Sequence, residues 1–162
     1  MSKASLEASN IPLVLNADIG TKTKIRIPSG TFNVVKTENQ KKVFIATGTG
    51  ITPFFSIINE LSKNNPRLKL NLLWGIRHEN EDFSSMYLQD LLRTEQLEKT
   101  LCLSAPMNQN ETFYCGRVTD KLHESNIDFA KSDFYICGNP TMVYNVQQFL
   151  YLKGATNIYF EV

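Results

Sequence analysis

The sequence from about Val43 to Val162 predicts an α/β fold in which helices cover both faces of a five-stranded parallel sheet. Two observations predict it. Short apolar runs alternate with longer stretches whose apolar residues recur at helical spacing. A turn rich in Gly and Pro joins strand to helix after the first run and again after the fourth. With strands ordered 3-2-1-4-5, strands one and four are neighbours, so both turns border the crevice at the switch point.

The first strand is predicted at 43–46, where four apolar residues run together. A helix over 54–61 follows it, because its apolar residues fall on one face, and the Asn-Asn-Pro sequence at 64–66 ends it. The second strand is predicted at about 68–74. A second helix is expected to carry the apolar residues of 86–92.

The pattern then repeats. The third strand is predicted at 101–103, a short helix at 117–124, and the fourth strand at 134–137. The last helix is expected over 141–153, because its apolar positions keep helical spacing. Gly154 follows it, where a left-handed cap is favourable.

The first forty residues differ from the rest. Leu13–Leu15, Lys24–Ile27 and Phe32–Val35 are short alternating runs separated by Gly and Pro, as in antiparallel strands or the rim of a barrel. Forty residues are too few for a barrel of their own. We therefore expect two parts, a leading segment at 1–38 and the main α/β domain at 39–162.

Composition excludes several classes of function. Lys and Arg number 17 against 16 for Asp and Glu, so the formal charge of +1 offers no broad field for nucleic acid or an anionic membrane. No apolar run approaches the roughly 20 residues of a membrane span, and residues 1–10 lack the apolar middle of a secretion signal. We expect a cytoplasmic protein without nucleic-acid partner or membrane span.

The cysteines and histidines show no metal-binding spacing. Cys102, Cys115 and Cys137 are odd in number and lack a C-x-x-C pair, so we expect free thiols. His78 and His123 have no second ligand type nearby in sequence, and we expect both as exposed polar side chains. No metal site is predicted.

The turn Thr47–Pro53 is the most informative segment. Gly48 and Gly50 permit close backbone approach and positive φ, so several N–H groups can point into one anion-sized space. Pro53 suits the first helical turn and Thr52 is expected to be the N-cap, so the helix start offers a phosphate site. It is neither a Walker A loop nor a strict G-x-G-x-x-G fingerprint. The residues alone leave two interpretations, a phosphate-binding turn or a plain strand-to-helix turn.

The second turn, Cys137–Met142, also follows a strand and precedes a helix, with Pro140 early in that helix. At the end of its strand and near a helix N-terminus, Cys137 is expected to have a lowered pKa or to place its sulfur against a flat ring. The alternative is a small buried hydrophobe that closes the strand. The fifth strand is predicted at Ile158–Val162, where the one charge, Glu161, fits an edge residue in water.

At these two turns the chain resembles the ferredoxin NADP reductase superfamily, over roughly 25–150. The nicotinamide domain of that superfamily carries a G-T-G-x-x-P turn after strand one and a C-G-x-P-x-M turn after strand four. The second turn is most similar to that of the bacterial ferredoxin or flavodoxin reductases. Both motifs are complete here, as Gly48-Thr49-Gly50-Ile51-Thr52-Pro53 and Cys137-Gly138-Asn139-Pro140-Thr141-Met142.

The resemblance implies a Rossmann-like fold, preceded by a few antiparallel strands left from a flavin-binding barrel. It also implies NADH or NADPH as hydride donor, with Thr47–Pro53 on the pyrophosphate and the second turn facing the nicotinamide. Cys137 would then lie near the carbon that gives up hydride. Glu161 resembles an acidic residue near the C-terminus of several relatives that polarises this site. FAD would accept the hydride and pass electrons to ferredoxin, flavodoxin or another acceptor.

Two arginines bear on the choice of dinucleotide. Arg77 and Arg117 match arginines of the NADPH-using relatives, where a 2'-phosphate needs cationic partners, but solvated surface side chains are the other interpretation. Ala105 and Tyr144 stand where those relatives often carry basic residues. The preference between NADH and NADPH therefore stays open.

The flavin-binding motif R-x-Y-S or R-x-Y-T is absent, with most of the barrel that would carry it. This chain alone is therefore expected to hold FAD poorly, and a flavin-carrying subunit becomes an expected partner. The first hypothesis is the NAD(P)H-binding module of a flavin-dependent oxidoreductase. The alternatives are a dinucleotide-binding regulatory or subunit module without independent turnover, and a Rossmann-like domain for another nucleotide.

Overall fold

The structure is a computed structural model that describes residues 18–22, 32–82, 95–108 and 111–162. The chain divides into two compact units, and the second, Phe32–Val162, holds every helix and strand described below. In the first unit, residues 18–21 form a turn closed by the Thr21 N–H, which donates to the Asp18 carbonyl at 3.0 Å. Across the described part of the chain, no helix combines the length and apolarity of a membrane span.

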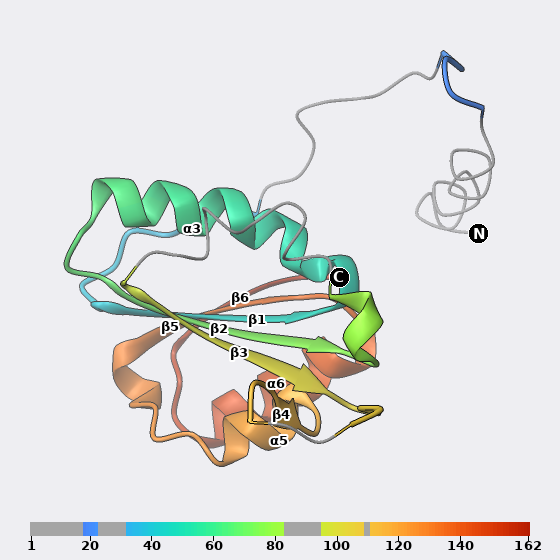
Figure 1. Cartoon of the computed structure of the whole chain (residues 1–162). Helices are drawn as coiled ribbons and strands as arrows, with labels where there is room; N and C mark the ends of the chain where they lie inside the picture. Colours follow the sequence, from blue (N-terminus) through green and yellow to red (C-terminus); the bar gives the residue numbers. More distant parts are fainter. Residues whose placement is uncertain (1–17, 23–31, 83–94, 109–110) are drawn as a thin grey trace, which may run out of the picture. The chain divides into compact units, whose positions relative to one another are not determined.

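A six-stranded sheet, parallel throughout, forms the centre of this unit (Figure 1). Its order is β4-β3-β2-β1-β5-β6, which confirms the predicted order 3-2-1-4-5 and adds one short edge strand, β4, that the sequence did not predict. The strands are β1 Lys41–Thr47, β2 Lys69–Ile76, β3 Leu97–Leu103, β4 Tyr114–Cys115, β5 Ser132–Cys137 and β6 Asn157–Glu161.

Helices cover both faces of the sheet. The helix α3, Thr52–Asn64, lies on one face, whereas α5, Val118–His123, and α6, Pro140–Leu152, lie on the other (Figure 1). Two buried clusters result, one between the sheet and α3 and one between the sheet and α5 and α6. This sandwiching explains why 43–46 is apolar at every position, because a central parallel strand is buried on both faces.

The two long helices start differently. For α6, the Asn139 side chain accepts from the Thr141 N–H at 2.9 Å and the Met142 N–H at 3.4 Å. For α3 the prediction that Thr52 is the N-cap is wrong. A 3-10 turn, Gly48–Ile51, runs directly into the helix, so the backbone is already helical at Ile51 and needs no polar cap. The Thr52 hydroxyl instead donates to the Thr49 carbonyl at 2.9 Å.

Among the remaining predictions, some are confirmed, one is wrong, and some fall outside the described residues. Gly154 has φ +78°, which confirms the left-handed residue expected after α6. The strand predicted at Phe32–Val35 is wrong, because this segment pairs with no strand in the described residues. Its groups go elsewhere: the Val35 N–H donates to the Tyr135 hydroxyl at 3.2 Å, and Phe32 packs on Phe54. The helix predicted at 86–92 and the runs at 13–15 and 24–27 lie outside the described residues.

A buried charge fixes the segment that enters β1. Asp133, fully buried in β5, forms an ion pair with Lys42 and accepts from Thr37 at 2.5 Å, Asn39 at 2.7 Å and Asn157 at 2.9 Å. Desolvation raises the pKa of Asp133, but these four donors outweigh it, and the pKa lies below its usual value. The network therefore ties 37–39 to the start of the central strands.

Candidate functional site

The two sequence-predicted turns lie side by side at the carboxyl end of the sheet. β1 and β5 are neighbours, with Ala46 opposite Cys137 in register, so the turns that follow them leave from the same edge. The expected juxtaposition is therefore present. Together they line an open cleft of about 800 Å³, whose walls are Thr47, Gly48, Thr49, Gly50, Thr52, Pro53, Cys137, Gly138, Asn139, Glu161 and Val162.

Glycines allow the two turns to touch. A Cβ on Gly50 would lie 2.5 Å from the Cys137 carbonyl oxygen and 2.6 Å from the Gly138 Cα. A Cβ on Gly138, at φ +140°, would collide with the Thr47 side chain. That Thr47 hydroxyl accepts from the Asn139 N–H at 2.9 Å. The contact between the turns is thus backbone against backbone, and it needs glycine at both positions.

The two glycines of the first turn are needed for different reasons. Gly48 has φ +53°, a conformation that L residues with side chains rarely adopt, and open space lies where its Cβ would be. Gly50 does not have positive φ, so the expectation that both glycines supply it is wrong. The reason for Gly50 is the approach of the second turn. The Gly48 carbonyl accepts from the Trp74 indole N–H at 3.0 Å.

Cys137 and Glu161 lie beside each other in the same cleft. They are register partners in β5 and β6, and β6 is the edge strand of the sheet. Cys137 is half-buried and Glu161 is exposed. Burial raises the pKa of the Cys137 thiol, and the charge of Glu161 raises it further, so the prediction of a lowered pKa is wrong. The thiol stays protonated at neutral pH.

This arrangement of turns agrees with the comparison to known proteins. Residues 44–148, well over half of the chain, match the family described as the oxidoreductase NAD-binding domain. The chain belongs to this family. It is an NAD(P)-binding domain of the ferredoxin reductase type, which confirms the resemblance inferred from the two turns.

Relatives of this oxidoreductase NAD-binding domain are redox proteins. The chain is 24% identical over 148 residues to the toluate 1,2-dioxygenase electron transfer component of Pseudomonas putida, covering 90% of this chain and 43% of that protein. It is 30% identical over 135 residues to NADH-cytochrome b5 reductase 1 of Candida glabrata, covering 80% and 47%. The chain therefore spans less than half the length of either relative.

A solved structure shares the fold of this domain. It is the flavohem-like FAD/NAD-binding domain of nitric oxide dioxygenase from Vibrio cholerae. The TM-score is 0.71 at 22% identity, over 83% of this chain and 55% of that one. The predicted Rossmann-like α/β fold is thereby confirmed.

Several predicted site residues lie outside the cleft. Arg77, after β2, and Arg117, before α5, are exposed side chains that do not line it. Pro140 is exposed at the start of α6. Met142 is only 8% exposed and packs in the core between the sheet and α6. Within the described residues, no group of three or more His, Cys, Asp or Glu side chains is arranged to hold a metal ion.

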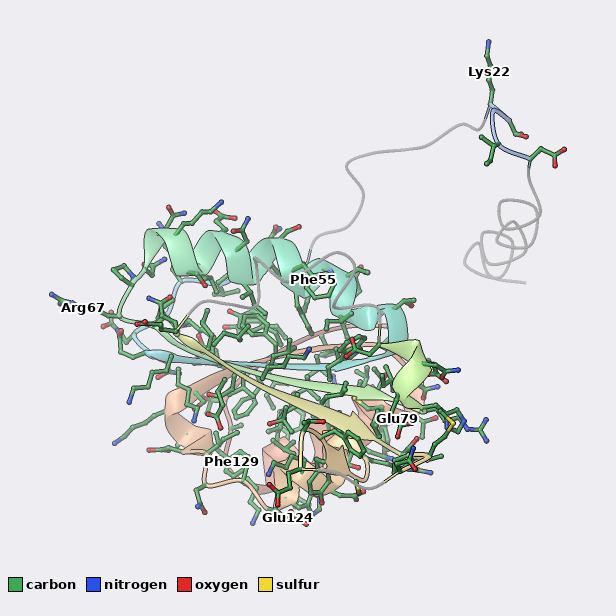
Figure 2. The ribbon with its side chains drawn as sticks, in the orientation of Figure 1. Lys22, Phe55, Arg67, Glu79, Glu124 and Phe129 are labelled. Carbon is green, nitrogen blue, oxygen red and sulfur yellow. The ribbon has the colours of Figure 1, made fainter. Side chains whose placement is uncertain are left out.

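The loops after β2 and β3 are tied together at the same edge of the sheet, where Figure 2 labels Glu79. The Glu79 carboxylate accepts from the backbone N–H groups of Met107, at 3.0 and 3.1 Å, and Asn108, at 3.2 Å. Hydrogen bonds from its own N–H and then from Met107 lower the pKa of Glu79. His78 Nδ1 lies 2.5 Å from the Ala105 carbonyl oxygen, so this half-buried histidine is not the exposed side chain expected.

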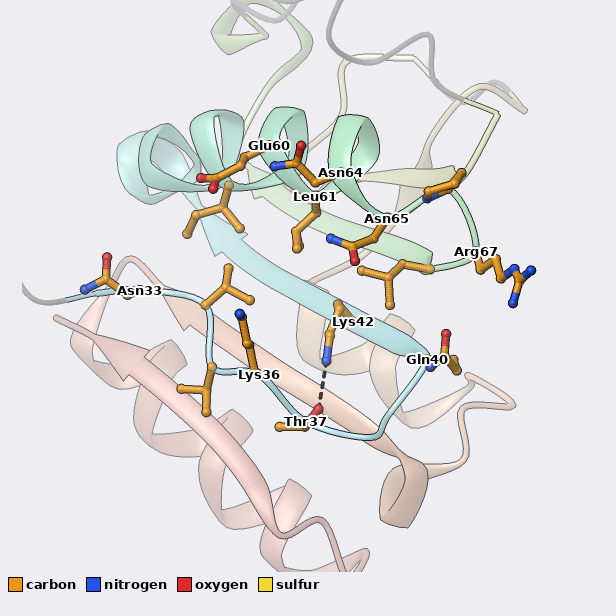
Figure 3. Close-up of a pocket in the computed structure, with 15 residues that line it drawn as sticks. Asn33, Lys36, Thr37, Gln40, Lys42, Glu60, Leu61, Asn64, Asn65 and Arg67 are labelled. Atoms are coloured by element: carbon orange, nitrogen blue, oxygen red, sulfur yellow. Dashed lines mark hydrogen bonds between the residues drawn. The ribbon is translucent and has the colours of Figure 1, made fainter.

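A second cavity, of about 900 Å³, lies at the amino end of the strands (Figure 3). It is bounded by the segment 33–42, the end of α3 and the loop 64–68, and includes the bond from the Lys42 ammonium to the Thr37 hydroxyl at 2.8 Å. No sequence-predicted site residue lines it. It is distinct from the cleft between the turns.

Proposed function

We propose that the chain binds NADH or NADPH in the cleft between the two turns and is the NAD(P)H-binding module of a flavin-dependent oxidoreductase. The observation that carries this proposal is the contact of the two turns at the carboxyl edge of β1 and β5, in a member of an oxidoreductase NAD-binding family. An open crevice at the switch point of a doubly wound sheet is where such folds take dinucleotides.

The first turn fits a pyrophosphate. Gly48 and Thr49 are exposed, and the missing Cβ of Gly48 leaves open space, so an anionic group can approach the backbone. Thr47, Gly50, Thr52 and Pro53 complete this wall of the cleft. We assign the pyrophosphate to these residues.

The second turn fits the nicotinamide. Cys137, Gly138 and Asn139 line the cleft, with Pro140 and Met142 completing the motif. The reduced nicotinamide supplies the hydride when it is bound. A thiol that stays protonated offers a neutral, polarisable surface to a flat ring, and Glu161 supplies negative charge beside it. Cys137 and Glu161 are accordingly our candidates for catalytic residues.

The adenosine end is assigned to the loops beyond β2 and β4. Arg77 and Arg117 are exposed cations at this edge of the sheet, suited to a 2'-phosphate. Their presence favours NADPH, and the negative charge of Glu79 nearby in sequence favours the free hydroxyl of NADH. Both dinucleotides stay in the proposal.

The rest of the electron path is assigned by analogy with the relatives, which are named as an electron transfer component and a cytochrome b5 reductase. We propose that FAD, held by a flavin-carrying domain or subunit, takes the hydride. Ferredoxin, flavodoxin or another redox protein would take the electrons. The three free cysteines favour a reducing compartment, and we propose the cytoplasm. The division at 38 and 39 stays a prediction.

The test begins with the purified chain and calorimetric titration of NADH and NADPH. FAD is then added, and oxidation of each dinucleotide with ferricyanide is followed. Binding with turnover is the expected result. Binding without turnover, even after a flavin domain is supplied, would favour a regulatory or subunit module. No heat from either dinucleotide would contradict the proposal and favour another nucleotide.

A further inference from the structure

Trp74 reaches the first turn from a neighbouring strand. It lies in β2, opposite Ala46 in register, one residue before β1 reaches Thr47 and the turn. Its side chain is fully buried, and its indole N–H donates to the Gly48 carbonyl at 3.0 Å. An indole nitrogen is a donor only, so a buried tryptophan needs an acceptor, and here the acceptor is the turn itself.

Because the peptide is planar, the bond to the Gly48 carbonyl also orients the N–H of Thr49. In a trans peptide the C=O and the following N–H point in opposite directions. With the Gly48 carbonyl held on the buried indole, the N–H of Thr49 points away from that indole, and Thr49 lines the cleft. Gly48 has no side chain to restrict its own rotation, so the indole adds a restraint to the one that the 3-10 turn Gly48–Ile51 already provides.

We propose that Trp74 is a positioning residue for the dinucleotide site, which orients the Gly48–Thr49 peptide so that its N–H faces the bound pyrophosphate. The proposal rests on the function assigned above. Trp74 does not contact the ligand and acts through the turn. Losing the donor, while keeping the shape of the ring, should weaken NADH or NADPH binding about three- to tenfold, the range of one ordinary hydrogen bond.

A sharp test separates the hydrogen bond from the packing. Trp74 is the only tryptophan of the chain, so growth of a tryptophan auxotroph on β-(3-benzothienyl)alanine replaces this side chain alone. The sulfur analogue keeps two fused rings but has no N–H donor. Trp74→Phe is the genetic counterpart. Tyr135→Phe is the matched control, because it also removes a polar group from a fully buried aromatic, one bonded to Val35 and not to the turn.

The measurements are dinucleotide affinity by calorimetry and the Thr49 amide signal by NMR. We expect the sulfur analogue to bind three- to tenfold more weakly, with a shifted Thr49 amide, while Tyr135→Phe binds like the wild type. Wild-type affinity and an unmoved Thr49 amide in the folded analogue would overturn the inference.

If neither variant folds, a measurement on the wild-type chain still tests the inference. The single indole N–H signal should exchange slowly with solvent and shift when NADH or NADPH is added. Fast exchange, as in a solvated indole, would overturn the inference. The proposed function fails separately, if the wild type binds neither dinucleotide while the Thr49 amide still depends on the indole N–H.

Discussion

Gly50→Ala adds one methyl group where the two turns touch. The new Cβ would lie 2.5 Å from the Cys137 carbonyl oxygen, whereas non-bonded heavy atoms prefer about 3.5–4.0 Å. The clash is with backbone, so no side chain can rotate away, and the turns must separate by roughly 1 Å. Alanine carries no conformational penalty at this position, because Gly50 does not have positive φ. The effect therefore isolates the contact between the turns.

The magnitude follows from overpacking, which costs about 1–3 kcal/mol. At about 2–4 °C per kcal/mol for a chain of this size, Tm should fall by roughly 2–12 °C. If the displaced turn loses about one hydrogen bond to the ligand, the dinucleotide should also bind up to about tenfold more weakly. Thermal unfolding followed by circular dichroism measures the first effect, and calorimetric titration with NADH and NADPH measures the second.

Gly154→Ala is the matched control for Gly50→Ala. Gly154 has φ +78° with open space around its missing Cβ, and it lies after α6, outside the cleft. Alanine there should lower stability by about 1 kcal/mol through backbone conformation and leave affinity unchanged. Wild-type Tm and wild-type affinity in Gly50→Ala would refute the contact between the turns.

Three further predictions concern Asp133, Cys137 and Glu79. Asp133→Asn leaves the buried Lys42 ammonium without its counter-ion and should lower the free energy of unfolding in urea at pH 7 by about 3–5 kcal/mol. Because the folded pKa of Asp133 is lowered, its stabilisation is full above about pH 4 and is lost as pH falls through the folded pKa, so variant and wild type converge in acid. Alkylation of Cys137 should be slow at pH 7, and Glu161→Gln should speed it, because burial and then that charge raise the thiol pKa. Glu79→Ala should increase amide hydrogen exchange at residues 107 and 108.

For Asp133, a difference in stability between wild type and Asp133→Asn that persists unchanged at pH 2 would contradict the assigned pKa direction. Alkylation needs a Cys115→Ser background, since that thiol is exposed, and equal rates with and without Glu161 would remove the electrostatic coupling. For the bond between the loops, Glu81→Ala is the control. The Glu81 carboxylate accepts from the backbone N–H of Arg77, so its loss should leave the amides of residues 107 and 108 protected from exchange. Unchanged exchange in Glu79→Ala would show that the tie does not hold the loop.

The central elements of the sheet are predictable from sequence because burial on both faces leaves a continuous apolar run. Val43–Ala46 is such a run, and the turn after it breaks the pattern at once. β4 is not predictable, because two residues carry no period and pair only where β3 already provides an edge. Phe32–Val35 has the alternation of a strand, but its backbone bonds a tyrosine side chain from β5, which no local pattern reveals.

The site is predictable in position but not in detail. The glycines of the first turn mark a close approach, yet only the fold shows that Gly50 faces Cys137 and Gly138 whereas Gly48 supplies the positive φ. The pKa of Cys137 depends on a charge from the neighbouring strand β6, and the sequence places the two residues 24 positions apart. The bond from Trp74 to the turn likewise joins residues that only the register of β1 and β2 brings together.

In the proposed function, two backbone turns hold one dinucleotide. Titration of the ¹⁵N-labelled chain with NADH and NADPH, followed through the amide signals, shows whether both turns contact the ligand. If both turns bind the ligand, the largest shifts fall on residues 47–52 and 138–142, together and with the same saturation curve. Shifts confined to the cavity at 33–42 and 64–68, or shifts in one turn without the other, would contradict it.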